Sequence, residues 1–195
     1  MKIAIDIDEV IVEFVEKYLE FVESRGVRRV DYEDVFCYEL WEVLGIEKDL
    51  VVKLFDEYNF TEYFKKHDFV EGAREGVVFL RDNHDICFIT ARPKDRIKET
   101  KDFIMNEFGV FGDKVLFSGD IIREGKNKDE ICRELGVGVI IEDNGSSSLE
   151  YAENGLRVLL LDKPWNRRVE HERIYRCFSW DDVLDKIKEI EDENL

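Results

Sequence analysis

The segment Lys2-Ile-Ala-Ile-Asp6-Ile-Asp8-Glu-Val-Ile-Val12 places two aspartates at the end of an apolar run rich in β-branched residues. Side chains alternate between the two faces of a strand, so this run predicts a buried strand that carries Asp6 and Asp8 on one side of its carboxyl end. Two carboxylates this close repel each other, and a hard divalent cation with oxygen ligands is the simplest compensating charge. The alternative is a strand end with solvated acids, so the functional interpretation depends on the rest of the chain.

The composition is that of a globular protein with an acidic surface. The chain has 195 residues, of which 44% are hydrophobic, and this length predicts one large domain or one domain with a smaller insertion. With 46 acidic against 29 basic residues, the net charge of -17 repels polyanions and acidic membrane surfaces. We therefore expect neither a nucleic acid polymer nor a membrane as partner, whereas a local cation can still admit a small phosphate ester.

Cysteine usage and the N-terminus indicate a cytoplasmic protein. The four cysteines are dispersed, without a C-x-x-C pair, and predict reduced, mostly buried thiols rather than a zinc site. The N-terminus lacks a signal-peptide pattern, and no apolar run reaches the length that spans a bilayer. The oligomeric state is left open by the sequence, and a homodimer is compatible with it.

Apolar periodicity along the chain predicts strands that alternate with helices. After the first strand, further strands are expected at residues 85–91, 114–117, 137–141, 157–162 and 174–178. Helices are expected at residues 10–24, 72–83, 93–108, 127–135 and 149–154, with a final helix after the cap-like Ser179. This alternation predicts an α/β fold with a doubly wound parallel sheet and right-handed crossovers.

An aromatic-rich segment interrupts this alternation between residues 27 and 68. Helical patterns near residues 32–44 and 48–59 indicate a small helical cap inserted after the first strand and helix, so that residues 1–26 and 69–195 form the α/β core. A small insertion must bury large side chains to be stable, so most of its rings are expected to form its own core. A minority, with Trp41 as the candidate, is expected to face a ligand.

Polar side chains recur where the predicted strands end or the following helices begin. They are Asp6, Asp8, Thr90, Arg92, Lys128, Glu142 and Asp143. Ligands of open parallel sheets lie beyond the carboxyl ends of the strands, so these residues are expected to form one site.

This set of residues suits phosphoryl transfer. The chain has no Gly-x-Gly-x-x-Gly and no Gly-x-Ser-x-Gly segment, which argues against hydride transfer and acyl transfer of those types. A carboxylate can act as nucleophile through an aspartyl-phosphate, and Asp6 is our candidate. Asp8 would protonate the leaving alkoxide and then activate water. Thr90 and Lys128 would hold the phosphoryl oxygens, and Asp143 would hold the metal ion.

Four segments together resemble the motifs of haloacid-dehalogenase-type (HAD) phosphatases. They are Asp6-Ile-Asp8-Glu-Val10, Phe88-Ile-Thr90-Ala91-Arg92-Pro93, Lys128 at the start of a helix, and Ile141-Glu142-Asp143. The helical insertion, Gly72-Ala73 and Asp162-Lys-Pro-Trp-Asn166-Arg167 further resemble the 5'(3')-deoxyribonucleotidase branch. The resemblance implies Mg²⁺-dependent hydrolysis of nucleoside monophosphates, with Asp6, Asp143 and the backbone of Asp8 at the metal and Thr90, Ala91, Arg92 and Lys128 at the phosphate.

Three positions depart from the family pattern or leave it ambiguous. Glu9 replaces the glycine common after the second aspartate, and Glu142 precedes the metal-binding aspartate where the family often has Asp or Gly; either can alter metal geometry. Lys126 competes with Lys128 as the motif lysine, and we favour Lys128 because Asp-Glu-Ile follows it.

Several alternatives stay open. A receiver-type signalling domain also uses paired acids, Thr and Lys, but the inserted cap argues against it. A binding protein without turnover, and transfer of the phosphoryl group to another acceptor, would use the same residues. The aromatic stretches 36–41 and 58–64 favour nucleoside 5'-monophosphates through base stacking, whereas rings confined to the cap core would favour a sugar phosphate or phosphoglycolate.

Overall fold

Six strands form one parallel sheet in the order β3-β2-β1-β4-β5-β6 in the computed structural model, which describes residues 1–65, 68–119 and 125–193. The strands are β1 (Lys2–Ile5), β2 (Asp85–Thr90), β3 (Val115–Phe117), β4 (Val139–Glu142), β5 (Arg157–Leu161) and β6 (Ile174–Cys177). In the register of the central strand, Ile3 pairs with Ile86 on one side and Val139 on the other. The predicted doubly wound α/β fold is confirmed, with the order typical of the Rossmann architecture.

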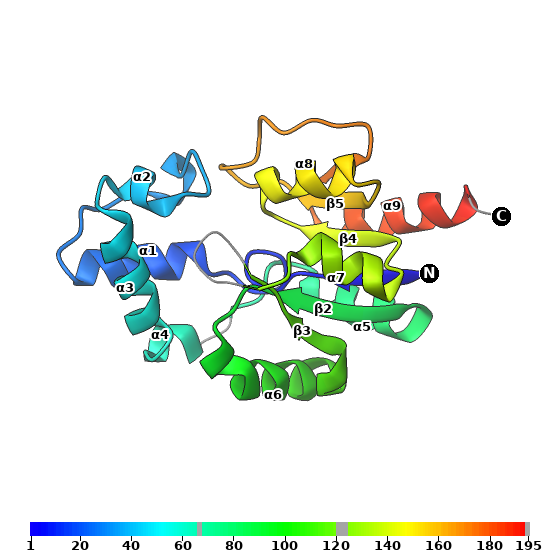
Figure 1. Cartoon of the computed structure of the whole chain (residues 1–195), viewed down its shortest axis with the longest axis horizontal. Coiled ribbons are helices and arrows are strands. Elements are labelled where there is room, and N and C mark those ends of the chain that lie inside the picture. The colour runs from blue at the N-terminus through cyan, green and yellow to red at the C-terminus, as the bar shows by residue number, and fades with distance from the viewer. Residues whose placement is uncertain (66–67, 120–124, 194–195) are drawn as a thin grey trace.

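Helices cover both faces of the sheet (Figure 1). The core helices are α5 (Ala73–Asn83), α6 (Ile97–Phe108), α7 (Lys128–Leu135), α8 (Gly145–Glu153) and α9 (Trp180–Asp192), with short 3-10 turns at Lys94–Arg96 and Gly112–Lys114. Ile3 and Ile5 pack with α5, α6 and α9 in one hydrophobic cluster, whereas Ala4 packs with α7 and α8 in another. The central strand is therefore buried on both sides, as its continuous apolar run predicts.

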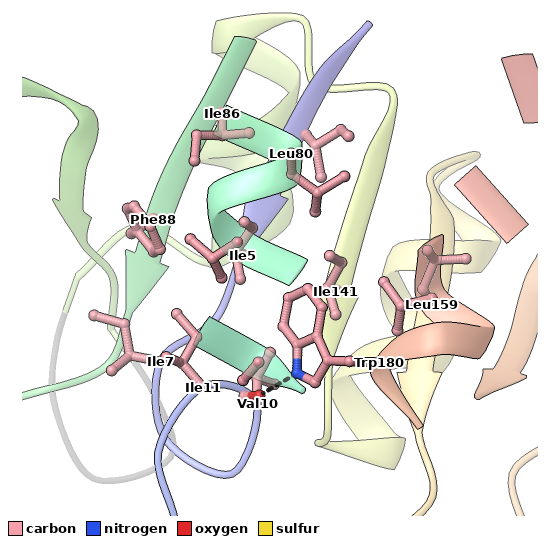
Figure 2. Packing of buried hydrophobic residues seen from close by; sticks show 14 of the residues in the cluster. Ile5, Ile7, Val10, Ile11, Leu80, Ile86, Phe88, Ile141, Leu159 and Trp180 are labelled. Atoms are coloured by element: carbon pink, nitrogen blue, oxygen red, sulfur yellow. Dashed lines mark hydrogen bonds between the residues drawn. The ribbon is translucent and has the colours of Figure 1, made fainter. Parts of the chain in front are cut away.

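The residues after β1 form a tight turn instead of the predicted helical start. The backbone N–H groups of Ile11 and Val12 both donate to Ile7 O, and α1 (Val15–Ser24) begins five positions later than expected. Val10, Ile11 and Val12 are at most 1% exposed, because the turn inserts them into the main core. Figure 2 shows Val10 beside Trp180, whose indole N–H donates to Val10 O at 2.9 Å.

Close packing of Trp180 explains a glycine in α5. A Cβ atom at Gly76 would lie 2.3 Å from Trp180 Cε3, so no side chain fits there without moving the indole ring. The N-terminus of α9 is thereby held against α5 and the turn after β1.

Helix α8 begins earlier than predicted, at Gly145 rather than Leu149. The Asn144 side chain accepts a hydrogen bond from Ser147 N at 3.0 Å, which caps the first turn. Serine has low intrinsic helix propensity, so the run of three serines indicated a loop from sequence although the cap makes it helical. The early start brings the helix N-terminus to the carboxyl edge of the sheet.

Four helices gather apart from the sheet, at the left of Figure 1. They are α1, α2 (Leu40–Leu44), α3 (Lys48–Tyr58) and α4 (Glu62–Lys65), with a 3-10 turn at Tyr32–Asp34. They share a separate hydrophobic cluster in which the Tyr18 and Phe55 rings stack with centroids 4.2 Å apart. Helix α1 belongs to this cluster, and the division into a core (1–26 and 69–195) and a cap (27–68) stays a prediction. Within the described ranges, no helix has the length and apolar character needed to cross a membrane.

Candidate active site

A cleft of about 330 Å³ lies between the carboxyl edge of the sheet and the cap. Its lining includes every site residue predicted from the sequence: Asp6, Asp8, Trp41, Thr90, Ala91, Arg92, Lys128, Glu142 and Asp143. The strand ends bring together side chains that are far apart in the chain, as expected for a ligand site of an open parallel sheet.

Lys128 lines the cleft and lies between two buried carboxylates. Its Nζ is 2.7 Å from Asp6 Oδ2 and 2.8 Å from Glu142 Oε2. A capping box formed by Asn127 and Glu130 fixes the start of α7 and thereby the position of this lysine. Both carboxylates raise the pKa of Lys128 well above its ordinary value, outweighing burial, so the ammonium stays charged.

Lys126, the competing lysine, lies outside the cleft. Its ammonium is exposed and pairs with Glu134 at 2.6 Å. Only Lys128 of the two therefore contacts Asp6 in this structure.

Glu142 is engaged by its neighbours on both carboxylate oxygens. Oε2 accepts from Lys128, while Oε1 accepts from the backbone N–H groups of Asp143 and Asn144, each at 3.2 Å. Burial would raise the pKa of Glu142, but Lys128 and the two N–H groups outweigh it and hold the pKa below its ordinary value. This residue is thus an ionised anchor for the lysine.

The acidic cluster fits a divalent cation. Carboxylate oxygens of Asp6, Glu142 and Asp143 lie within 4.8 Å of one another, and Asp6 Oδ1 is buried with no hydrogen-bond partner among the residues that the structure describes. Burial and the neighbouring carboxylate of Glu142 raise the pKa values of Asp6 and Asp143, and Lys128 offsets only part of this. Three buried acids with one lysine leave excess negative charge, which oxygen-ligated cations such as Mg²⁺ compensate.

The loop after β5 holds Asp143 in place. The Trp165 indole N–H donates to Asp143 Oδ2 at 3.0 Å, and the Asn166 side chain donates to Asp143 O at 2.7 Å. Arg176 on β6 in turn donates to Asn166 Oδ1 at 2.9 Å and to Asp162. The carboxylate of Asp143 is therefore oriented by a hydrogen-bonded loop, as outer-shell partners orient metal ligands.

Asp8 also lines the cleft, and its cationic partner is Arg92. Arg92 Nη2 and Nε donate to its two carboxylate oxygens at 2.7 and 2.9 Å, a bidentate fork. The Arg92 guanidinium also lies 4.9 Å from the Phe64 ring centroid, and Arg92 N donates to Thr90 Oγ1 at 3.1 Å. Asp6 and Asp8 therefore share one edge of the sheet but have different cationic partners.

Glu9 connects the cap to the core. Its Oε1 accepts from the backbone N–H groups of Phe14 and Val15 at 2.8 and 2.6 Å, at the start of α1. Its Oε2 accepts from Tyr32 Oη at 3.0 Å and from Lys163 Nζ at 2.9 Å. The φ angle of Glu9 is 62°, a left-handed conformation that costs a non-glycine residue about 1 to 2 kcal/mol.

The cap contributes several aromatic rings to the cleft. Tyr38 and Trp41 line it, and Lys48 Nζ lies 4.8 Å from the Trp41 ring. Tyr58 and Phe64 are buried in the cap cluster, and Phe64 also lines the cleft. Both predicted aromatic stretches therefore supply rings to the cleft, while Tyr58 belongs to the cap core.

Sequence reasoning assigned no site role to Lys163, Trp165 or Asn166. These residues follow β5 at its carboxyl end, so the edge rule that selected the other strand tips also applies to them. Glu9 was noted only as a departure from the family pattern, because its partner Lys163 lies far away in the chain.

Comparisons with known proteins agree with this geometry. A family model described as 5' nucleotidase, deoxy (pyrimidine), cytosolic type C protein matches residues 1–191. A nucleotidase of Clostridium acetobutylicum is 23% identical over 183 residues, covering 94% of this chain and 91% of that protein.

Solved structures show the same fold. A HAD family hydrolase from Deinococcus radiodurans, solved with bound phosphate and sodium, superposes with a TM-score of 0.61 at 16% identity and covers 96% of this chain and 95% of its own. A hydrolase from Pseudomonas syringae has a TM-score of 0.63 at 15% identity, covering 97% and 99%.

Proposed function

Since the chain belongs to the 5' nucleotidase, deoxy (pyrimidine), cytosolic type C family of HAD phosphatases, we propose that it hydrolyses (deoxy)nucleoside 5'-monophosphates with Mg²⁺ through a phosphorylated aspartate. The observation that carries the proposal is how the two carboxylate oxygens of Asp6 are engaged. One carboxylate oxygen is held by Lys128 at 2.7 Å, and the other is buried with no hydrogen-bond partner in the described part of the chain. A fixed carboxylate with an unengaged oxygen suits a nucleophile for phosphorus.

Asp6, Asp143 and the backbone carbonyl of Asp8 are the proposed holders of Mg²⁺. The bound ion supplies charge neutralisation for the phosphoryl oxygens. Glu142 is left out of this set because Lys128 and two backbone N–H groups occupy its oxygens.

The proposed reaction has two displacements at phosphorus. A carboxylate oxygen of Asp6 forms a bond to phosphorus while the ester P–O bond breaks, and protonated Asp8 gives its proton to the leaving alkoxide. Asp8 then takes a proton from water, the water oxygen attacks the phosphoryl group, and inorganic phosphate leaves with the Asp6 carboxylate restored.

Arg92 has to loosen its hold on Asp8 during this cycle, because it occupies both carboxylate oxygens and one of them must carry the transferred proton. Phosphate oxygens of a bound substrate are suitable competitors for the guanidinium. We propose that Arg92, with Thr90, the backbone at Ala91 and Lys128, contacts the phosphoryl group.

The rings of Tyr38 and Trp41 support a substrate with a base. Both line the same cleft as Asp6, and stacking on an aromatic ring is worth roughly 1 to 3 kcal/mol per base.

The chain is also proposed to act in the cytoplasm, since its four cysteines are all free thiols.

A panel of phosphate esters tests the proposal. Released phosphate would be measured for deoxynucleoside and ribonucleoside 5'-monophosphates, sugar phosphates and phosphoglycolate, with and without an added alcohol acceptor. The proposal expects the highest kcat/KM for a nucleotide, lowered by Trp41→Ala, with no phosphorylated alcohol. A higher kcat/KM for an ester without a base would refute the nucleotide assignment, and a phosphorylated alcohol as main product would indicate phosphotransfer.

A further inference from the structure

We propose that Glu9 is a positioning residue that holds the cap closed over the cleft by joining three separate segments. The segments are the start of α1, the Tyr32–Asp34 turn of the cap and the loop after β5. For its kinetic readout, the inference rests on the proposed nucleotidase function.

Glu9 is placed where it can link these segments at once. It follows Asp8 directly and is only 3% exposed. One oxygen accepts two backbone N–H groups of α1, and the other accepts Tyr32 and Lys163. A buried carboxylate with four donors is fully satisfied, so each segment is held by a charge-assisted hydrogen bond.

The left-handed backbone conformation of Glu9 indicates that its side-chain contacts determine the local structure. A φ angle of 62° is readily adopted by glycine but rarely by a side chain with a Cβ atom. Such conformations persist where surrounding contacts determine them, and they cluster at functional sites. Here the carboxylate contacts offset the unfavourable backbone.

The contacts of Glu9 with Lys163 and Tyr32 extend to Asp143 in the cleft. Lys163, which donates to Glu9, lies two residues before Trp165, which donates to Asp143. The Tyr32 ring packs edge-on against Trp165 with centroids 5.6 Å apart. Closure of the cap and orientation of Asp143 therefore depend on one connected set of contacts. Because Glu9 contacts the cap directly and Asp143 only through the loop after β5, its loss is expected to loosen the cap more than it disturbs Asp143.

The test compares Glu9→Gly, Tyr32→Phe, the double variant and a matched control, Glu13→Gln. Glu13 is an exposed carboxylate on the same segment, outside the cleft lining. Glu9→Gly removes the carboxylate and suits the left-handed backbone, whereas Tyr32→Phe removes a single donor from the cap and keeps the ring. Kinetics with a nucleoside monophosphate and with p-nitrophenyl phosphate would be combined with amide hydrogen exchange.

We expect Glu9→Gly to raise KM for the nucleotide about tenfold. The effect on KM for the aryl ester should be much smaller, because this ester has no nucleoside for the cap to contact. Exchange of the Phe14 and Val15 amides should accelerate by a similar factor, about tenfold, while that of Leu80 in the core stays unchanged. Tyr32→Phe should act in the same direction, and its effect should vanish in the Glu9→Gly background.

Equal losses on both substrates, or unchanged exchange at Phe14 and Val15, would overturn the inference. Additive effects of the two substitutions would also overturn it, because the two residues would then act independently. If the wild-type protein hydrolyses the aryl ester but no nucleotide, the substrate proposal fails while the exchange data still decide the role of Glu9.

Discussion

Lys128 reaches from the first turn of α7 to Asp6 at the end of β1, with its ammonium 2.7 Å from Asp6 Oδ2. The pair is buried, and Glu142 completes it from β4 at 2.8 Å. In water-excluded surroundings a fixed positive charge stabilises negative charge far better than at a surface. The strand ends thus combine a candidate nucleophile with a candidate electrostatic stabiliser.

Replacement of this lysine should cost most of the activity. For Lys128→Ala we expect kcat to fall by about 10² to 10³, the effect of losing one preorganised electrostatic group. Lys126→Ala is the matched control, because its ammonium lies at the surface and pairs with Glu134. Released phosphate from both variants gives the comparison, and a loss at Lys126 equal to or larger than that at Lys128 would show that the other lysine acts.

Chelation should abolish activity, because the carboxylates of Asp6 and Asp143 are expected to need a cation between them. Turnover would be measured in excess chelator and after addition of Mg²⁺, Mn²⁺ or Co²⁺, and all three ions should restore it to some degree. Full activity in excess chelator would contradict the metal site.

Trp165→Phe should weaken metal binding while an aromatic ring still lines the cleft at this position. The substitution removes the N–H that orients Asp143, and loss of such an outer-shell partner typically costs about 10- to 100-fold in metal affinity. Trp41→Phe is the control, since Trp41 lines the cleft on the cap side and is expected to affect KM for the nucleotide only. Calorimetric titration with Mg²⁺ reports both affinities, and an unchanged value for Trp165→Phe would rule out the orienting role.

Thiol reactivity should distinguish Cys37 from the other cysteines. Burial raises the pKa of Cys87 to about 11 and those of Cys132 and Cys177 to about 12, so these thiols stay protonated and inaccessible in the native protein. Cys37 is only partly buried and lines the cleft. A thiol reagent at mildly alkaline pH should label Cys37 first, and labelling of Cys87 at the same rate would contradict the packing.

The sequence predicted the sheet and the set of residues at its edge because both follow from local periodicity. Alternating apolar runs located all six strands, and the edge rule gathered Asp6, Thr90 and Lys128. The family resemblance is confirmed by the match over residues 1–191.

Other features depended on contacts between distant segments. Val10 to Val12 have helical spacing, but they fill the core beside Trp180, which no local pattern reveals. The partner of Glu9 is Lys163, 154 positions away, and the partner of Asp8 is Arg92, 84 positions away. Tertiary packing decided these details.

Direct detection of a phosphoryl group on Asp6 tests the central claim most closely. Wild-type protein mixed with a nucleoside monophosphate and Mg²⁺, then quenched in acid within the first turnover, should carry phosphate on the peptide that contains Asp6, and hydroxylamine should remove it. Asp6→Asn should carry none and release no phosphate, whereas Asp8→Asn should bind Mg²⁺ and still fold. Wild-type rates of phosphate release by Asp6→Asn, or a phosphoryl group on another residue, would contradict the account.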